Sequence, residues 1–117
     1  MTASASERLE GPTWLAEDIK GGGVIDNAQT TVSFAAGGKV TGSGGCNRLF
    51  GTATVAGETL TFGGIGTTRM ACVPALMDQE RKFLDALAAT RTFRFHGPYL
   101  KFYAGNGAEL VRFTALR

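Results

Sequence analysis

The chain has 117 residues, with twelve Lys and Arg against ten Asp and Glu, and a net charge of +2. This length suits one domain with a single core and is too short for two. No block of like charges indicates a polyanionic partner, and no apolar run approaches the roughly 20 residues that span a bilayer. We therefore expect a single monomeric domain without a transmembrane segment.

The N-terminal residues show no export signal, because residues 1–6 lack both a basic region and an apolar run. A cytoplasmic protein has such a start, and so does the mature part of an exported protein placed behind a new methionine. We interpret residues 1–8 as a flexible tail and residues 9–117 as the domain.

Short β-prone segments separated by glycine turns fill most of the domain, and the chain holds seventeen glycines. A first element begins at Leu9 and ends at the glycines of 21–23, and hairpins follow over 30–43 and 50–62. A third hairpin and a closing strand occupy residues 91–114. Seven or eight short strands at this spacing predict a small barrel or a strongly curved antiparallel sheet.

Residues 74–90 differ from the rest, because their apolar positions recur every three or four residues. The repeat consists of Leu76, Phe83, Leu84 and Leu87, with Glu80 on the same side of the helix. Pro74 suits the first helical turn, where its missing N–H costs nothing. We predict one amphipathic helix that covers an end or a face of the sheet, and an α+β fold class dominated by antiparallel β structure.

Two cysteines stand in polar motifs, Gly-Cys-Asn-Arg at 45–48 and Thr-Arg-Met-Ala-Cys at 68–72. Two cysteines in a small β domain form a disulfide, remain as buried thiols, or contribute half of a metal site. The metal site is disfavoured, because two cysteines and one histidine cannot close a tetrahedral zinc site without carboxylates. We expect no metal and no other cofactor.

No residue pattern indicates catalysis. The glycines at 42–45 lead into a strand and not into a helix, as a phosphate-binding loop would require. The chain lacks a Gly-x-Ser-x-Gly elbow, and its single histidine, His96, has no acid placed by the sequence to orient it. We expect the protein not to be an enzyme.

The order of these features resembles the META domain family. Trp14, the strand at 32–34, the two cysteine motifs, the helix and the closing hairpin carry the resemblance, which covers roughly Leu9 to Phe113. It implies a compact barrel-like fold with one helix, an extracytoplasmic setting, whether periplasmic, secreted or lipid-anchored, and no enzymatic activity. The chain departs from the family at its N-terminus, where members commonly carry a signal or lipid-attachment segment, so a cytoplasmic location stays open.

The resemblance also implies a role for the residues around both cysteine motifs. In an exported protein it implies a disulfide between Cys46 and Cys72, which would stabilise the fold by about 3–4 kcal/mol; two reduced thiols are the cytoplasmic alternative. It further implies a buried polar network made of Asn47, Arg48, Arg69 and Glu80. A carboxylate on the apolar side of a helix needs a partner, and we expect Arg69 or Arg48 to pair with Glu80.

The closing hairpin offers one candidate binding face. If Gly97-Pro98 is a two-residue turn, Phe95 lies opposite Leu100 on a face that belongs to the core. The other face carries Arg94, His96, Tyr99, Lys101 and Tyr103, with Arg94 opposite Lys101. Such a face could meet a lipid headgroup, an acidic glycan or single-stranded nucleic acid, although the small net charge disfavours nucleic acid. The alternative is an ordinary solvated strand face.

Together these patterns predict a non-enzymatic structural or interaction domain of the cell envelope, whose partner is a protein, lipid or glycan. The alternative is a carrier whose barrel interior holds a small apolar ligand or lipid. Eight phenylalanines suffice to fill so small a barrel, which argues against the carrier.

Overall fold

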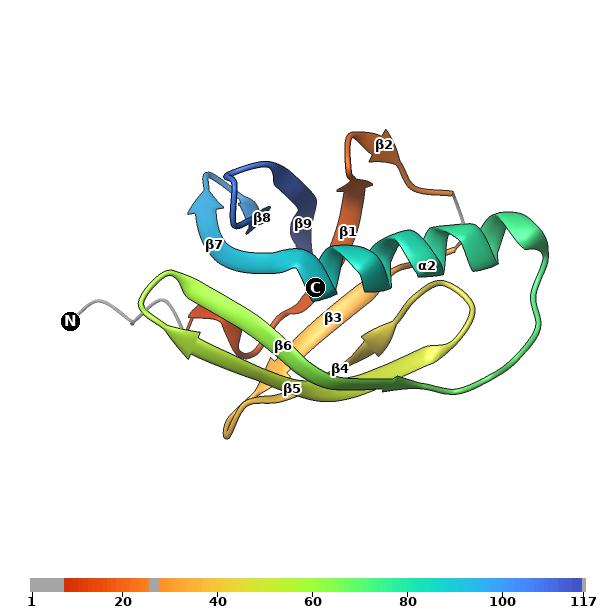
Figure 1. The fold of residues 1–117 in the computed structure, drawn as a ribbon, viewed down its shortest axis with the longest axis horizontal. Helices are drawn as coiled ribbons and strands as arrows, with labels where there is room; N and C mark the ends of the chain where they lie inside the picture. The colour runs from red at the N-terminus through yellow and green to blue at the C-terminus, as the bar shows by residue number, and fades with distance from the viewer. Residues whose placement is uncertain (1–7, 26–27, 117) are drawn as a thin grey trace.

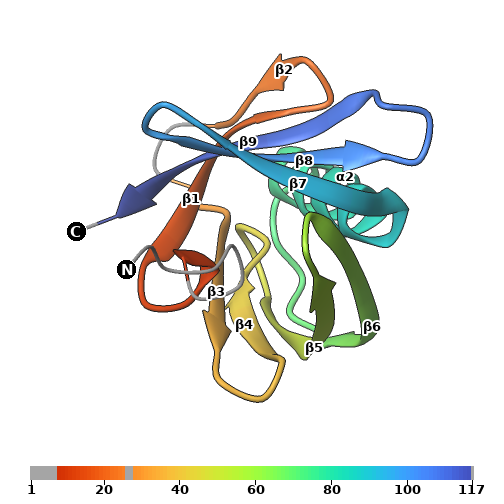
Figure 2. The ribbon, with the colours of Figure 1, turned by 90° about the vertical axis from the view of Figure 1, so that its left-hand side faces the viewer.

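One antiparallel sheet curves into a ring, and one long helix lies across an opening of that ring (Figures 1 and 2). The computed structural model describes residues 8–25 and 28–116. The strands are β1 (Thr13–Ile19), β2 (Gly22–Gly23), β3 (Thr31–Ala35), β4 (Lys39–Ser43), β5 (Arg48–Ala56), β6 (Thr59–Thr67), β7 (Thr90–His96), β8 (Tyr99–Ala104) and β9 (Glu109–Leu116), and the helix is α2 (Pro74–Ala89). The predicted α+β class, curved sheet and helix are confirmed.

The sheet has nine strands in the described residues, against the seven or eight predicted. The additional strand is β2, in the glycine segment that the sequence analysis treated only as a break. Lys20 and Gly21 both have positive φ, 54° and 81°, and this tight turn brings Gly22 opposite Ile19. A two-residue turn of this kind matches the twist of a hairpin.

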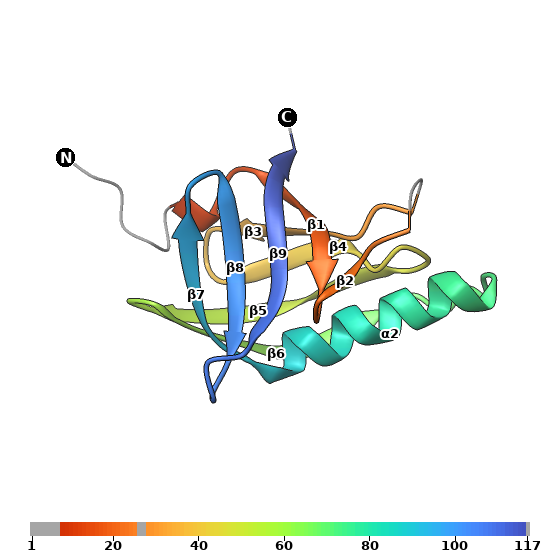
Figure 3. The same cartoon turned by 90° about the horizontal axis from the view of Figure 1, so that it is seen from above.

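The ring closes through β1, which pairs with β3 at one edge and with β9 at the other. Its weakest junction lies between β6 and β7, which share the single pair Thr59 and Thr92. Helix α2 contacts β6, β9 and β1 (Figure 3). The helix therefore joins β6 to two strands, β1 and β9, with which β6 does not pair.

Helix α2 begins where the sequence predicts, with Pro74 in its first turn, and ends at Ala89 because Thr90 adopts an extended conformation. Its buried face consists of Gln79, Glu80, Phe83, Ala86 and Leu87. No helix in the described ranges is long and apolar enough to cross a membrane.

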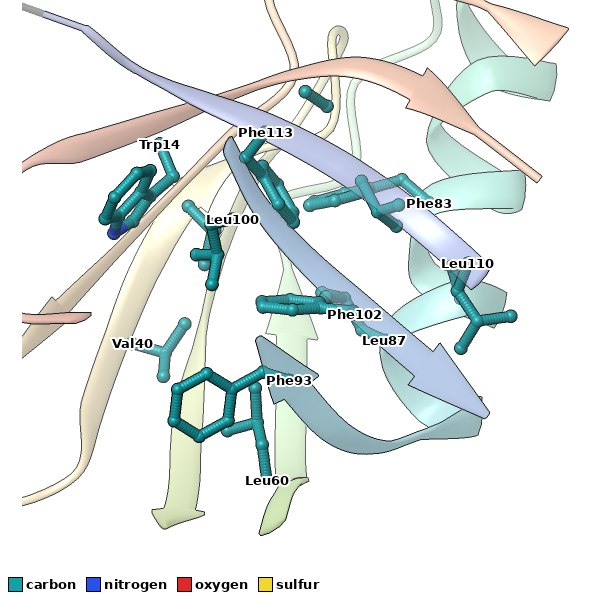
Figure 4. Packing of buried hydrophobic residues seen from close by; sticks show 14 of the residues in the cluster. Trp14, Val40, Leu60, Phe83, Leu87, Phe93, Leu100, Phe102, Leu110 and Phe113 are labelled. Atoms are coloured by element: carbon teal, nitrogen blue, oxygen red, sulfur yellow. The ribbon is translucent and has the colours of Figure 1, made fainter. Parts of the chain in front are cut away.

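Aromatic side chains fill the interior of the ring (Figure 4). Phe102 is fully buried, and its ring centroid lies 4.7 Å from that of Phe113, which in turn meets Phe83 of the helix at 6.1 Å. Seven of the eight phenylalanines belong to this core or pack against it. The interior is therefore occupied by the protein's own side chains.

Two contacts hold the first described residues against the rest of the domain. The indole nitrogen of Trp14 donates a hydrogen bond to the carbonyl oxygen of Leu9, and the guanidinium of Arg8 lies 3.9 Å from the centroid of the Phe95 ring. The predicted tail, residues 1–8, lies outside the described residues apart from Arg8. The domain boundary at residue 9 stays a prediction.

Candidate functional site

A disulfide between Cys46 and Cys72 joins the turn before β5 to the segment before α2. The two Cα atoms lie 6.1 Å apart, and the bond connects residues separated by 26 positions. This is the pairing that the resemblance implies. It fixes the long connection between β6 and α2 to the body of the sheet.

Asn47, which follows the first of these cysteines, is the centre of a hydrogen-bond network and is only 4% exposed. Its backbone N–H donates to Glu80 Oε1 at 2.6 Å, and its side-chain Nδ2 donates to Glu80 Oε2 at 2.9 Å. Its Oδ1 accepts from the backbone N–H of Met70 at 2.6 Å and from the Thr68 hydroxyl at 3.0 Å. One amide side chain thus joins β5, the connection before the helix, and the helix itself.

Glu80 is buried on the helix face that packs against the sheet, with 8% of its surface exposed. Both of its carboxylate oxygens accept hydrogen bonds from Asn47, so its buried charge is satisfied by amide donors. A Cβ atom placed on Gly44 would lie 2.5 Å from Glu80 Cγ. Glycine at position 44 therefore makes room for the carboxylate.

The arginine that we expected to pair with Glu80 is not its partner. Arg48 is exposed on the outer face of β5, because its neighbour Leu49 points into the core and successive strand residues face opposite ways. Arg69 is exposed on the connection before the helix. In residues 8–25 and 28–116 neither arginine forms an ion pair, so the network retains Asn47 and Glu80 of the four predicted members.

Two further buried polar residues extend the network and were missed by the sequence analysis. Gln79 donates through Nε2 to the Thr30 hydroxyl at 2.8 Å and to the Ala28 carbonyl at 3.1 Å, and its Oε1 accepts from the backbone N–H of Ile25. Thr30 in turn donates to the Gly44 carbonyl. Gln79 is the neighbour of Glu80 on the helix. Its partners are mostly backbone groups of the loop before β3, and the sequence pattern does not predict backbone groups as partners.

The closing hairpin has the register predicted for a turn at Gly97-Pro98. Phe95 lies opposite Leu100, Arg94 opposite Lys101, and His96 opposite Tyr99. Phe93 and Phe102, paired on the inner face, are buried. The five predicted residues of the outer face, Arg94, His96, Tyr99, Lys101 and Tyr103, therefore lie on the two strands of one hairpin.

Carboxylates accompany the basic residues of this hairpin face. Lys101 Nζ lies 3.1 Å from Glu109 Oε1, and Arg94 Nε lies 3.8 Å from Glu58 Oε2. The next strand adds Arg112, whose guanidinium lies 5.1 Å from the Tyr99 ring centroid. These pairs offset the like charges of Arg94 and Lys101, so the face carries less uncompensated charge than the sequence suggests.

The described ranges contain no group of three or more His, Cys, Asp or Glu side chains arranged to hold a metal. His96 is exposed near the hairpin turn, and no carboxylate in the part of the chain that the structure describes forms an ion pair with it. The polar groups of the Asn47 network are instead bonded to one another. The arrangement is suited to holding backbone segments together.

Comparison with known proteins gives a family match and three similar folds. The model of the META domain family matches residues 7–116. No curated protein matches the chain.

A protein solved by NMR superposes with a TM-score of 0.75 at 22% identity, over 97% of this chain and 95% of its own. An NMR structure of a protein from Burkholderia xenovorans gives 0.73 at 24% identity, over 99% of this chain and 92% of its own. A crystal structure of a DUF4847 family protein from Bacteroides vulgatus gives 0.58 at 20% identity, over 73% of this chain and 57% of its own. At these identities the likeness concerns the fold alone.

Proposed function

The chain belongs to the META domain family, and from that membership we propose that it acts as a non-enzymatic structural or interaction domain of the cell envelope. The observation that carries the proposal is the Cys46–Cys72 disulfide. Disulfides persist in oxidising compartments outside the cytoplasm and are rare within it. An extracytoplasmic location, whether periplasmic, secreted or lipid-anchored, follows from this reasoning.

The use of the buried polar groups supports a structural role over a catalytic one. Asn47 engages its backbone N–H, its amide nitrogen and its amide oxygen, and Glu80 engages both carboxylate oxygens. A general acid or base must present a free position to a substrate. Groups that are fully engaged with one another stabilise the fold and leave the surface to make contacts.

The alternative, a carrier with a ligand inside the ring, has less support. Phe83, Phe93, Phe102 and Phe113 are all fully buried within the ring or under the helix. A small barrel filled by its own side chains has no room for a lipid-sized molecule. We therefore propose that the protein contacts its partner, a protein, lipid or glycan of the envelope, through its outer surface.

Fractionation of the source cells tests the proposal. We expect the protein in the envelope or exported fraction, and its recovery from the cytoplasm would overturn the proposal. Native mass spectrometry of the purified protein distinguishes a structural or interaction domain from a carrier. For the former we expect the mass of the oxidised chain alone. A co-purifying lipid or metabolite in stoichiometric amount would favour the carrier.

A further inference from the structure

Five large apolar residues of the described ranges are exposed to solvent. They are Ile25, Phe50, Met70, Val73 and Met77. Four of them lie near the start of β5, on the connection between β6 and α2, or on the first turn of α2. Figure 1 shows these segments at one end of the longest axis, which extends over 46 Å against 30 and 27 Å for the others. Met70 and Met77 border one open hollow, so the surface around them is a candidate interaction surface.

The backbone that presents these side chains is held in place. The N–H and the carbonyl oxygen of Met70 are both bonded to the side chain of Asn47, while its own side chain is 58% exposed. Val73 follows the disulfide-bonded Cys72 and occupies the position just before the helix, with 62% of its surface exposed. Met70 and Met77 share the rim of an open hollow of about 460 Å³. The network described above therefore fixes apolar groups in an outward position.

Uncompensated positive charge accompanies this apolar end. Arg48 and Arg69 are exposed on the same segments and form no ion pair with any described residue. The acidic groups nearby are engaged: Glu80 is buried against Asn47, and Asp78 pairs with Arg81. The hairpin face differs, because its basic residues lie beside carboxylates.

We propose that this end of the molecule, formed by Phe50, Met70, Val73 and Met77 with Arg48 and Arg69, docks onto an anionic lipid surface. The methionine and valine side chains enter the boundary between headgroups and acyl chains, and the two guanidinium groups contact lipid phosphates. Exposed apolar side chains beside two exposed guanidinium groups match the acyl chains and phosphates that an anionic lipid surface offers. The inference rests on the envelope location proposed above and names the partner as lipid.

Flotation of the full, oxidised chain with vesicles tests the docking. We expect binding to vesicles of phosphatidylglycerol and phosphatidylcholine, weakened by salt, and little binding to phosphatidylcholine alone. Met70→Ser combined with Val73→Ser removes apolar contact, and we expect the partition coefficient to fall by at least about tenfold. Arg48→Gln combined with Arg69→Gln should lower it by a similar factor on anionic vesicles.

The matched control is Lys20→Gln combined with Lys39→Gln, which removes the same charge from other exposed positions and should leave binding within about twofold of the parent chain. Thermal melts establish that each variant remains folded. Absence of binding to anionic vesicles at low salt would overturn the docking, as would equal losses in the control and the arginine variant.

Two other outcomes also decide against a lipid partner. If the chain dimerises in sedimentation and Met70→Ser with Val73→Ser abolishes the dimer, without vesicle binding by the parent, the surface belongs to a second copy. If the protein is found oxidised in the envelope fraction but does not bind vesicles, the docking proposal is refuted while the proposed function stands. A cytoplasmic location would instead refute the proposed function.

Discussion

Replacement of Glu80 by alanine measures what the buried network contributes to stability. The substitution removes two hydrogen bonds to the Glu80 carboxylate, at 2.6 and 2.9 Å. It leaves the backbone N–H of Asn47 without a partner, while Nδ2 keeps only its bond to the Met70 carbonyl among oxygen acceptors. Each such bond contributes about 1.5–3 kcal/mol. Water can enter from the open hollow that Asn47 borders and replace part of this, so we expect a loss of about 3 kcal/mol in the free energy of unfolding.

Two further substitutions sharpen this measurement. Glu80→Gln keeps one acceptor oxygen but turns an amide NH₂ toward the Asn47 NH₂ donor, and we expect a smaller loss of about 1–2 kcal/mol. Asp85→Ala, at an exposed position of the same helix, should stay within about 0.5 kcal/mol of the parent chain. Urea melts of the oxidised proteins give the three values. If Glu80→Ala is no more destabilising than Asp85→Ala, the network does not hold the helix.

A double-mutant cycle assigns the effect to the contact itself. Asn47→Ala also breaks the bonds to Thr68 and Met70, so we expect it to cost more than Glu80→Ala. The coupling energy between Asn47 and Glu80 should be about 1–3 kcal/mol, as for residues in one network. Strictly additive losses would mean that the two residues act independently.

Three other substitutions test separate parts of the structure. Gly44→Ala places a methyl group against Glu80 and should cost about 1–3 kcal/mol in urea melts, and this cost should shrink in the Glu80→Ala background, where Cγ is absent. Phe102→Ala opens a cavity between strands and helix and should cost about 3–5 kcal/mol by the same measurement. Arg94→Ala combined with Lys101→Ala should leave binding to anionic vesicles and short oligonucleotides unchanged at low salt, because carboxylates lie beside both groups. An equal cost of Gly44→Ala in both backgrounds, a negligible cost of Phe102→Ala, or a loss of salt-sensitive binding in the hairpin variant would each contradict the respective argument.

Local signals in the sequence predicted the elements well. The three- and four-residue spacing and Pro74 located the helix, and the turn at Gly97-Pro98 gave the register of the closing hairpin. Both features could be predicted because they depend on residues that are close together in the sequence. The strand β2 was missed because Lys20 is not a residue that commonly adopts positive φ. The pattern therefore indicated a break where the chain forms a tight turn.

Contacts between distant segments were predicted less well. The sequence placed Glu80 on the buried side of the helix, but charge alone suggested an arginine as its partner. The actual partner, Asn47, lies in the turn before β5, which positions its side chain next to Glu80. Arg48 points outward, because successive residues of a strand face opposite sides of the sheet. The exposed apolar end went unnoticed, because the exposure of Met70 and Met77 depends on how the connection and the helix meet the sheet.

The redox state of Cys46 and Cys72 in the source cells tests the central claim most directly. The claim is that this chain is a disulfide-bonded domain that works outside the cytoplasm. Rapid acid quenching followed by differential alkylation of the unfolded protein, with mass spectrometry, counts free thiols before and after reduction. We expect no alkylation before reduction and two alkyl groups after it. Two alkylated thiols before reduction would contradict the account.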